Sequence, residues 1–172
     1  MTPGLRKFAL TAHVASSVGW FGAVGGFLAL AVAGLTSRDA QMVRAAYLAM
    51  ELIAWFVIVP LAFASLLSGL VQSLGTTWGL FRHYWVLAKL LITVLATVVL
   101  LLKMKPISYM AGVAMATLSP ADPHGFGVEL VVHAGGGMLL LLVALTLSVY
   151  KPRGMTGYGR RKQREERVVL QP

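Results

Sequence analysis

The sequence predicts an all-α membrane protein, a four-transmembrane-helix bundle, from its composition and its long apolar runs. Hydrophobic residues make up 58% of the 172 residues and charged residues only 12%. A soluble domain has roughly half apolar and a quarter charged residues. Four apolar runs are each long enough for the about 20 residues that a helix needs to cross a bilayer core. Since these runs take up most of the chain, they leave no room for a second folded domain of ordinary size.

The bundle is expected to occupy residues 1–150, with spans at about residues 8–35, 42–73, 84–102 and 128–150. Ser37 or Asp39 can cap the second helix. Pro60, near the middle of the second span, should kink it, because the ring removes a backbone hydrogen bond and clashes with the preceding turn. Small residues let neighbouring helices approach closely, which is the role we expect for the glycines of the first and fourth spans, Gly19, Gly22, Gly25, Gly26 and Gly135 to Gly137.

The segment between the third and fourth spans is the longest connection in the chain. Lys103 and Lys105 are expected to close the third span. The following stretch, ISYMAGVAMATL, is apolar but only about half a span long, so we expect a short interfacial or re-entrant helix there. The run SPADPHGFG, with two prolines and two glycines, then predicts a loop.

The tail at residues 151–172 is too polar and basic to fold alone. It holds seven of the fifteen Lys and Arg residues, and a basic tail beside a span favours anionic lipid headgroups over nucleic acid as its partner. Four spans place both termini on one side of the bilayer. That side carries ten of the Lys and Arg residues and the other carries four. The count predicts a plasma-membrane (bacterial inner-membrane) protein with both termini in the cytoplasm.

His13 is an ionisable residue inside the first span, which makes it a candidate functional residue. It lies at the same expected depth as Lys89 of the third span, and the two can share a layer if those spans are neighbours. A neutral imidazole here can be the axial ligand of a haem iron, with Lys89 or Arg82 beside a propionate. Alternatively, His13 makes a polar contact with Ser16, Ser17 or a backbone carbonyl of a neighbouring helix.

A second polar layer is expected in the opposite half of the membrane. It contains Glu51, His124, Glu129 and His133 and most of the methionines, Met42, Met50, Met104, Met110 and Met115. Thioether and imidazole ligands suit Cu(I). The same residues also suit a paired Glu51 and His133 with a structural or proton-handling role, and the methionines can simply fill gaps between helices.

Motifs for hydrolytic or phosphoryl-transfer chemistry are absent from the sequence. The chain has no cysteine, which excludes disulfides, thiolate metal sites and cysteine nucleophiles. It also has no G-x-S-x-G, Walker loop or H-E-x-x-H motif. Chemistry in this protein would therefore need a bound cofactor.

Several short motifs resemble a known group of membrane proteins. His13 precedes Trp20-Phe21, Pro60 precedes LLSGL, and Trp85 and Lys89 lie in WVLAKLLIT. Over about the first 105 residues this order resembles the HemJ-type protoporphyrinogen oxidases and the related CopD-like copper-resistance proteins. The ending LSVYKPRG is more similar to an uncharacterised family of small bacterial membrane proteins in the same group. The resemblance implies that His13 ligates haem b and that Lys89 is required for function.

Together these features predict a haem b-binding membrane redox protein that acts in electron transfer or oxidises a porphyrinogen or a quinol. The candidate cofactor-binding residues are His13, at the haem iron, and Lys89, Arg82, His83 and Trp20. The alternative is a non-enzymatic membrane protein. It would be either a copper handler that uses His133, Glu51 and His124 or an accessory subunit of a larger complex or homo-oligomer. Whether the chain is an enzyme stays open at this point.

Overall fold

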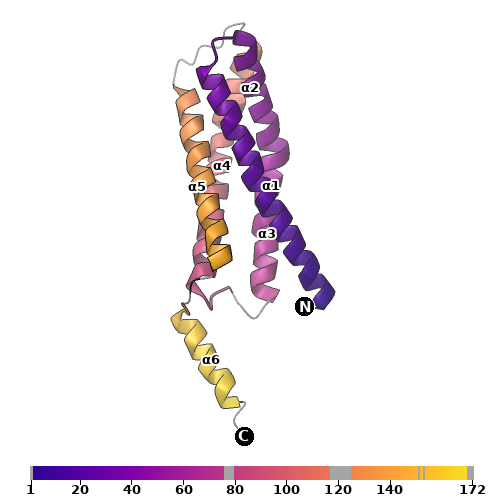
Figure 1. Cartoon of the computed structure of the whole chain (residues 1–172), viewed down its shortest axis with the longest axis vertical. Helices are drawn as coiled ribbons and strands as arrows, with labels where there is room; N and C mark the ends of the chain where they lie inside the picture. The colour runs from indigo at the N-terminus through magenta and orange to yellow at the C-terminus, as the bar shows by residue number, and fades with distance from the viewer. Residues whose placement is uncertain (1, 76–79, 117–124, 151, 153, 170–172) are drawn as a thin grey trace.

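The computed structural model describes residues 2–75, 80–116, 125–150, 152 and 154–169, apart from the side chains of residues 166, 167 and 169. These residues form a bundle of long helices with a shorter helix beyond one end (Figure 1). The elements are α1 (Pro3–Thr36), α2 (Ala40–Ile53), η1 (Ala54–Ile58), α3 (Val59–Gly75), α4 (Tyr84–Ala116), α5 (Phe126–Tyr150) and α6 (Gly157–Val169). Within the described residues, four helical stretches are long and apolar enough to cross a membrane, which confirms the four-span all-α fold.

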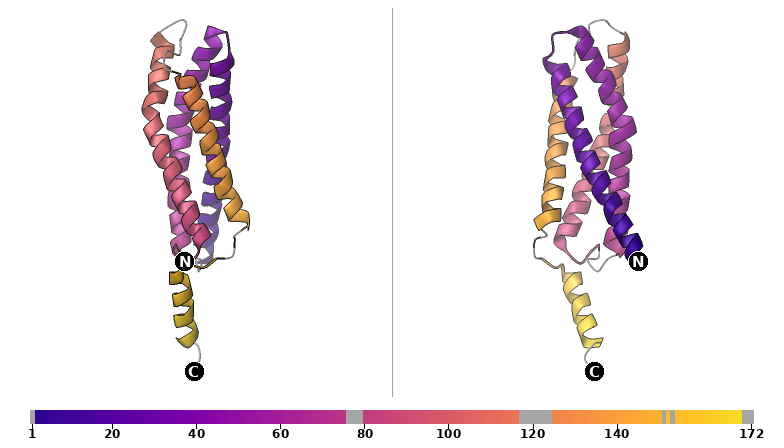
Figure 2. Two further views of the ribbon diagram at one scale, coloured as in Figure 1. Left: turned by 90° about the vertical axis from the view of Figure 1, so that its left-hand side faces the viewer. Right: turned by 45° about the vertical axis from the view of Figure 1, so that its right-hand side comes forward.

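The order of the helices around the bundle places α1 and α4 at opposite corners. α1 packs against α2 and α3 on one side and against α5 on the other. α4 also packs against α2, α3 and α5, and Figure 2 shows the same arrangement from two further directions. Both chain ends lie at the same end of the bundle (Figure 1), as an even number of spans requires. The first and third spans therefore lie diagonally across the bundle from each other and are not neighbours.

The second span continues without a break through α2, η1 and α3. Its helix begins at the predicted cap, where the Asp39 carboxylate accepts a hydrogen bond from the N–H of Gln41 at 2.9 Å. η1 is a single π-helical turn in which the N–H of Val59 donates to the carbonyl of Ala54. This turn lies directly before Pro60, whose ring would clash with an earlier carbonyl in a regular α-helix. Where a kink is predicted at Pro60, the structure thus has a wider turn directly before the proline.

The third span is longer than predicted, because α4 passes through Pro106 and ends at Ala116. The expectation of a separate short helix after Lys105 is therefore wrong for residues 107–116; residues 117–124 lie outside the described part of the chain. At about 1.5 Å per residue α4 is about 50 Å long, which exceeds the bilayer core. Buried side chains at helical spacing pack the last part of α4 against the bundle. They are Met104, Ile107, Met110, Ala111 and Ala114.

The C-terminal tail forms a helix, α6, which the sequence did not predict. Its first turn is tied to the residues that precede α4. The N–H of Thr156 donates to the carbonyl of Arg82 at 3.0 Å, and its hydroxyl donates to the carbonyl of Phe81. The same hydroxyl oxygen accepts from the N–H of Gly159 at 3.0 Å and so caps α6. A short helix rarely forms alone because its first turn is costly to nucleate, and these contacts, the α6 junction, fix that turn.

The α6 junction predicts opposite outcomes for two alanine substitutions two residues apart. A Cβ atom at Gly159 would press on the backbone of Arg82, whereas a Cβ at Gly157 meets nothing within 4 Å. Gly159→Ala should therefore release α6 from the bundle, and amide hydrogen exchange at Thr156 should accelerate. Gly157→Ala should keep the wild-type exchange rate. Equal rates in the two variants would contradict this packing.

Candidate functional sites in two layers

His13 lies at the interface between α1 and α3, half-buried. Its Nδ1 atom is 3.1 Å from the carbonyl oxygen of Ser65 and 3.1 Å from the hydroxyl oxygen of Ser68. The ring rests on Gly69, where a Cβ atom would lie only 3.1 Å from Cε1 of the imidazole. Ser17 and Ser65 add a hydroxyl–hydroxyl hydrogen bond of 2.8 Å in the same layer. These contacts match the alternative in which His13 bonds a backbone carbonyl of a neighbouring helix.

The partners of Nδ1 determine which nitrogen of the neutral His13 ring carries the proton. A carbonyl oxygen only accepts hydrogen bonds, so Nδ1 must donate to Ser65. The hydroxyl of Ser68 donates to the carbonyl of Ala64 at 2.5 Å, which leaves its oxygen to accept from the same Nδ1–H. The lone pair of the ring is then on Nε2. Histidines that ligate metals commonly have this arrangement, with one nitrogen on the metal and the other donating to a backbone carbonyl.

Lys89 of α4 lies in the same layer as His13, although α4 lies diagonally across the bundle from α1. Its ammonium group is near enough to interact electrostatically with the imidazole. It also lies 5.5 Å from the ring centroid of Trp85, one turn nearer the start of α4, in a cation–π contact. The side chain therefore extends toward the membrane surface, as intramembrane lysines commonly do.

The other inner candidates lie in different surroundings. The backbone of Arg82 takes part in the α6 junction, and His83 forms a β-bridge with Met155 beside it. Trp20 is 2% exposed, seven residues after His13 on the same helix. At 3.6 residues per turn, this spacing places Trp20 on the same face as His13 and two turns deeper in the bundle.

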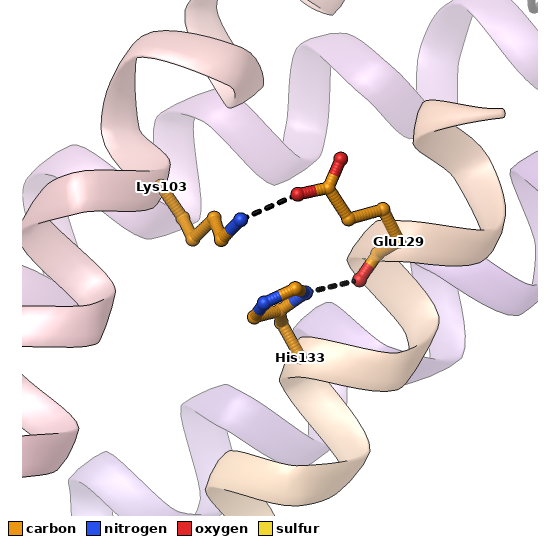
Figure 3. Close-up of polar contacts among 3 residues, drawn as sticks. All are labelled: Lys103, Glu129 and His133. Atoms are coloured by element: carbon orange, nitrogen blue, oxygen red, sulfur yellow. Dashed lines mark hydrogen bonds and ion pairs between the residues drawn. The ribbon is translucent and has the colours of Figure 1, made fainter. Parts of the chain in front are cut away.

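A second polar group joins α4 to α5 in the other half of the bundle (Figure 3). The ammonium of Lys103 donates to the carboxylate of Glu129, and the two side chains are 26% and 36% exposed. His133 lies one turn after Glu129 on α5. Its Nδ1 is 2.7 Å from the backbone carbonyl of Glu129 and donates to it, which leaves the lone pair of the neutral ring on Nε2.

A cavity of about 530 Å³ lies between α1, η1, α4 and α5. Lys103 and His133 belong to its lining, together with Trp20, Val24, Phe27 and Ile58 from the first two spans. Its walls are otherwise apolar, and His13 and Lys89 are not among its lining residues. Apolar cavities of this size with a few polar groups are typical of small-molecule binding sites.

The glycines do not all serve helix packing as predicted. Gly19 is close to α3, since a Cβ atom there would lie 3.3 Å from the Leu61 side chain. At Gly22 and Gly26, and at each of Gly135, Gly136 and Gly137, a Cβ atom would meet nothing within 4 Å. Gly136 and Gly137 line the cavity, so the triple glycine borders open space.

The residues considered for copper do not gather at one point in the described part of the chain. Met50, Met104 and Met110 are at most 4% exposed and pack in the apolar core, whereas Met42 and Met115 are more than half exposed. Glu51 is half-buried on α2, and His124 lies outside the described residues. No group of three or more His, Asp or Glu residues is placed to hold a metal ion among the residues that the structure describes.

Comparisons with protein-family models, with curated proteins and with solved structures found no match. The assignment of a function therefore depends on the geometry of the two layers. The sequence alone predicts Lys103 at the end of a span and does not indicate its pairing with Glu129. Had α4 been extended past Pro106, the two charges would have been expected inside the bundle, where opposite charges pair.

A double-mutant cycle on Lys103 and Glu129 should show strong coupling. Lys103→Met leaves a carboxylate without its cation inside the span, which should lower the thermal unfolding temperature in detergent. Adding Glu129→Met should recover part of the loss. The pair Arg161 and Glu165 on α6 is the control, because its side chains are 83% and 62% exposed and exposed pairs couple weakly. Additive effects of Lys103→Met and Glu129→Met would contradict the pairing.

Proposed function

We propose that this protein is a haem b-binding redox protein of the membrane, with His13 as an axial ligand of the iron. The observation that supports the proposal is the pair of hydrogen-bond partners of Nδ1 in the His13 ring. Because Nδ1 donates to the Ser65 carbonyl and to Ser68, the neutral imidazole offers Nε2 as a ligand atom, and the two hydrogen bonds hold the ring in one orientation.

The donor set of the inner layer fits a haem. An imidazole inside a span is the residue type that most often ligates haem iron. Lys89 supplies a positive charge in the same layer, which suits a propionate. Gly69 gives the imidazole room, because any larger residue there would press on the ring. A haem held in this way would supply one-electron redox chemistry, which no side chain of this layer can provide.

The proposed location is the plasma membrane, with both termini in the cytoplasm. The two termini lie at the same end of the bundle, and that end carries most of the Lys and Arg residues. The first two turns of α6 present exposed basic side chains, Arg160, Arg161 and Lys162, close to the α6 junction. These charges favour contact with anionic lipid headgroups.

The proposal predicts a coloured protein whose colour depends on His13. Purified wild-type protein should have a Soret band that shifts on reduction with dithionite. His13→Ala should lose the band, because the axial ligand is gone, and added imidazole should restore it in this variant. Val14→Ala, the adjacent lipid-facing position, should keep the band.

A colourless wild-type protein from cells supplied with haem precursor would overturn the proposal. A band that survives in His13→Ala but disappears in His133→Ala would contradict His13 as the ligand. In that case the haem would belong to the outer cavity and not to the inner layer.

A further inference from the structure

The cavity between α1, η1, α4 and α5 lies outside the inner layer to which the haem is assigned. We propose that it binds a neutral, membrane-soluble ring compound that carries hydroxyl or carbonyl groups, a ligand of the quinol and quinone class. The inference does not depend on haem binding at His13. It follows from the volume and lining of the cavity, its opening, and the two polar residues in its lining, Lys103 and His133.

The cavity suits an apolar ring in volume and in lining. About 530 Å³ is within the range that small-molecule sites occupy, roughly 300 to 1,000 Å³. Trp20 and Phe27 contribute two aromatic rings from α1, and Trp20 is almost fully buried. Flat apolar surfaces of this kind pack well against a flat ligand ring.

The cavity is bordered by side chains that reach the lipid-facing surface of the bundle. Val132, Leu139 and Val143 of α5 line it and are nevertheless 63%, 65% and 48% exposed. In a span, such exposure means contact with acyl chains. A ligand dissolved in the bilayer can therefore reach the cavity sideways, beside α5, without passing through water.

The polar groups select a neutral ligand over an anionic one. The charge of Lys103 is already balanced by Glu129, so Lys103 attracts a carboxylate or phosphate headgroup less than an unpaired ammonium would. His133 offers the lone pair of Nε2, which accepts a hydrogen bond from a hydroxyl group. Lys103 has three N–H donors, of which the Glu129 bond uses one, and it can also donate to a carbonyl oxygen.

The glycines of α5 keep the cavity open. Glycine in a helix interior is less favourable than alanine, and here three occur in succession. A Cβ atom at Gly136 or Gly137 would meet nothing within 4 Å. Both residues line the cavity, whereas Gly135 does not. The sequence thus maintains space at a position where larger residues would fit the bundle.

The test is a titration of the purified full-length protein with a short-chain benzoquinone, followed by tryptophan fluorescence. Quinones quench tryptophan on contact, and Trp20 lines the cavity, so the wild type should show saturable quenching. Trp20→Phe should lose the saturable part. His133→Leu, which removes one hydrogen bond, should raise the apparent Kd about fivefold.

Two glycine variants provide the matched comparison. Gly137→Leu fills the cavity and should abolish the saturable quenching. Gly135→Leu adds the same side chain outside the lining and should keep the wild-type Kd within about twofold. His13→Ala should also keep it, whether or not the protein binds haem, which separates this result from the test of the proposed function.

Three outcomes would overturn the proposal. Quenching that rises linearly with quinone would mean simple partition into detergent or lipid. Equal loss in Gly135→Leu and Gly137→Leu would mean that the cavity is not the binding site. A change from dimer to monomer in either variant, measured by light scattering, would identify the glycine face as an interface between two copies of this chain.

Discussion

The bilayer core contains no water to hydrogen-bond polar groups, and this constraint determines how the few polar side chains of the bundle are arranged. Each must find a partner on its own or a neighbouring helix. His13 bonds Ser65 and Ser68, which joins α1 to α3, and Lys103 pairs with Glu129, which joins α4 to α5. These two polar connections lie on opposite sides of the bundle. Apolar packing holds the sides together, with a hydrogen bond of 3.2 Å from Nε1 of Trp55 on η1 to the hydroxyl of Ser108 on α4.

One face of α1 connects the two layers. His13, Trp20 and Phe27 follow one another at seven-residue intervals, which is close to two helical turns. The first contacts α3 in the inner layer, and the other two line the outer cavity. A redox group at His13 and a ring compound beside Trp20 would be held by side chains two helical turns apart on one face of α1. The two proposals are thus physically compatible, although neither requires the other.

The sequence predicts those parts of the fold that depend on residues close to one another in the chain. Apolar runs predict the four spans and Asp39 predicts a helix start, and both are confirmed. Pro60 predicts a kink, and the structure has a π-helical turn directly before it. Longer-range packing decided the rest. Lys103 and Lys105 predict the end of the third span, yet buried side chains on both sides of Pro106 accompany a continuous helix α4. The partner of Lys103 and the junction that supports α6 come from segments distant in sequence, which no local pattern indicates.

A cavity affects the stability of a membrane protein differently from that of a soluble protein. Helices in a bilayer associate through van der Waals packing and polar contacts, because lipid tails are as apolar as their side chains. Helices that border a cavity lose van der Waals contacts with each other, and in a bilayer no hydrophobic effect compensates for the loss. Alanine at Gly136 or Gly137 would fill some of the space and favour the helix. A bundle that retains glycine there is therefore best stabilised by an apolar molecule from the bilayer, and the imidazole of His133 gives preference to one that carries a hydroxyl group.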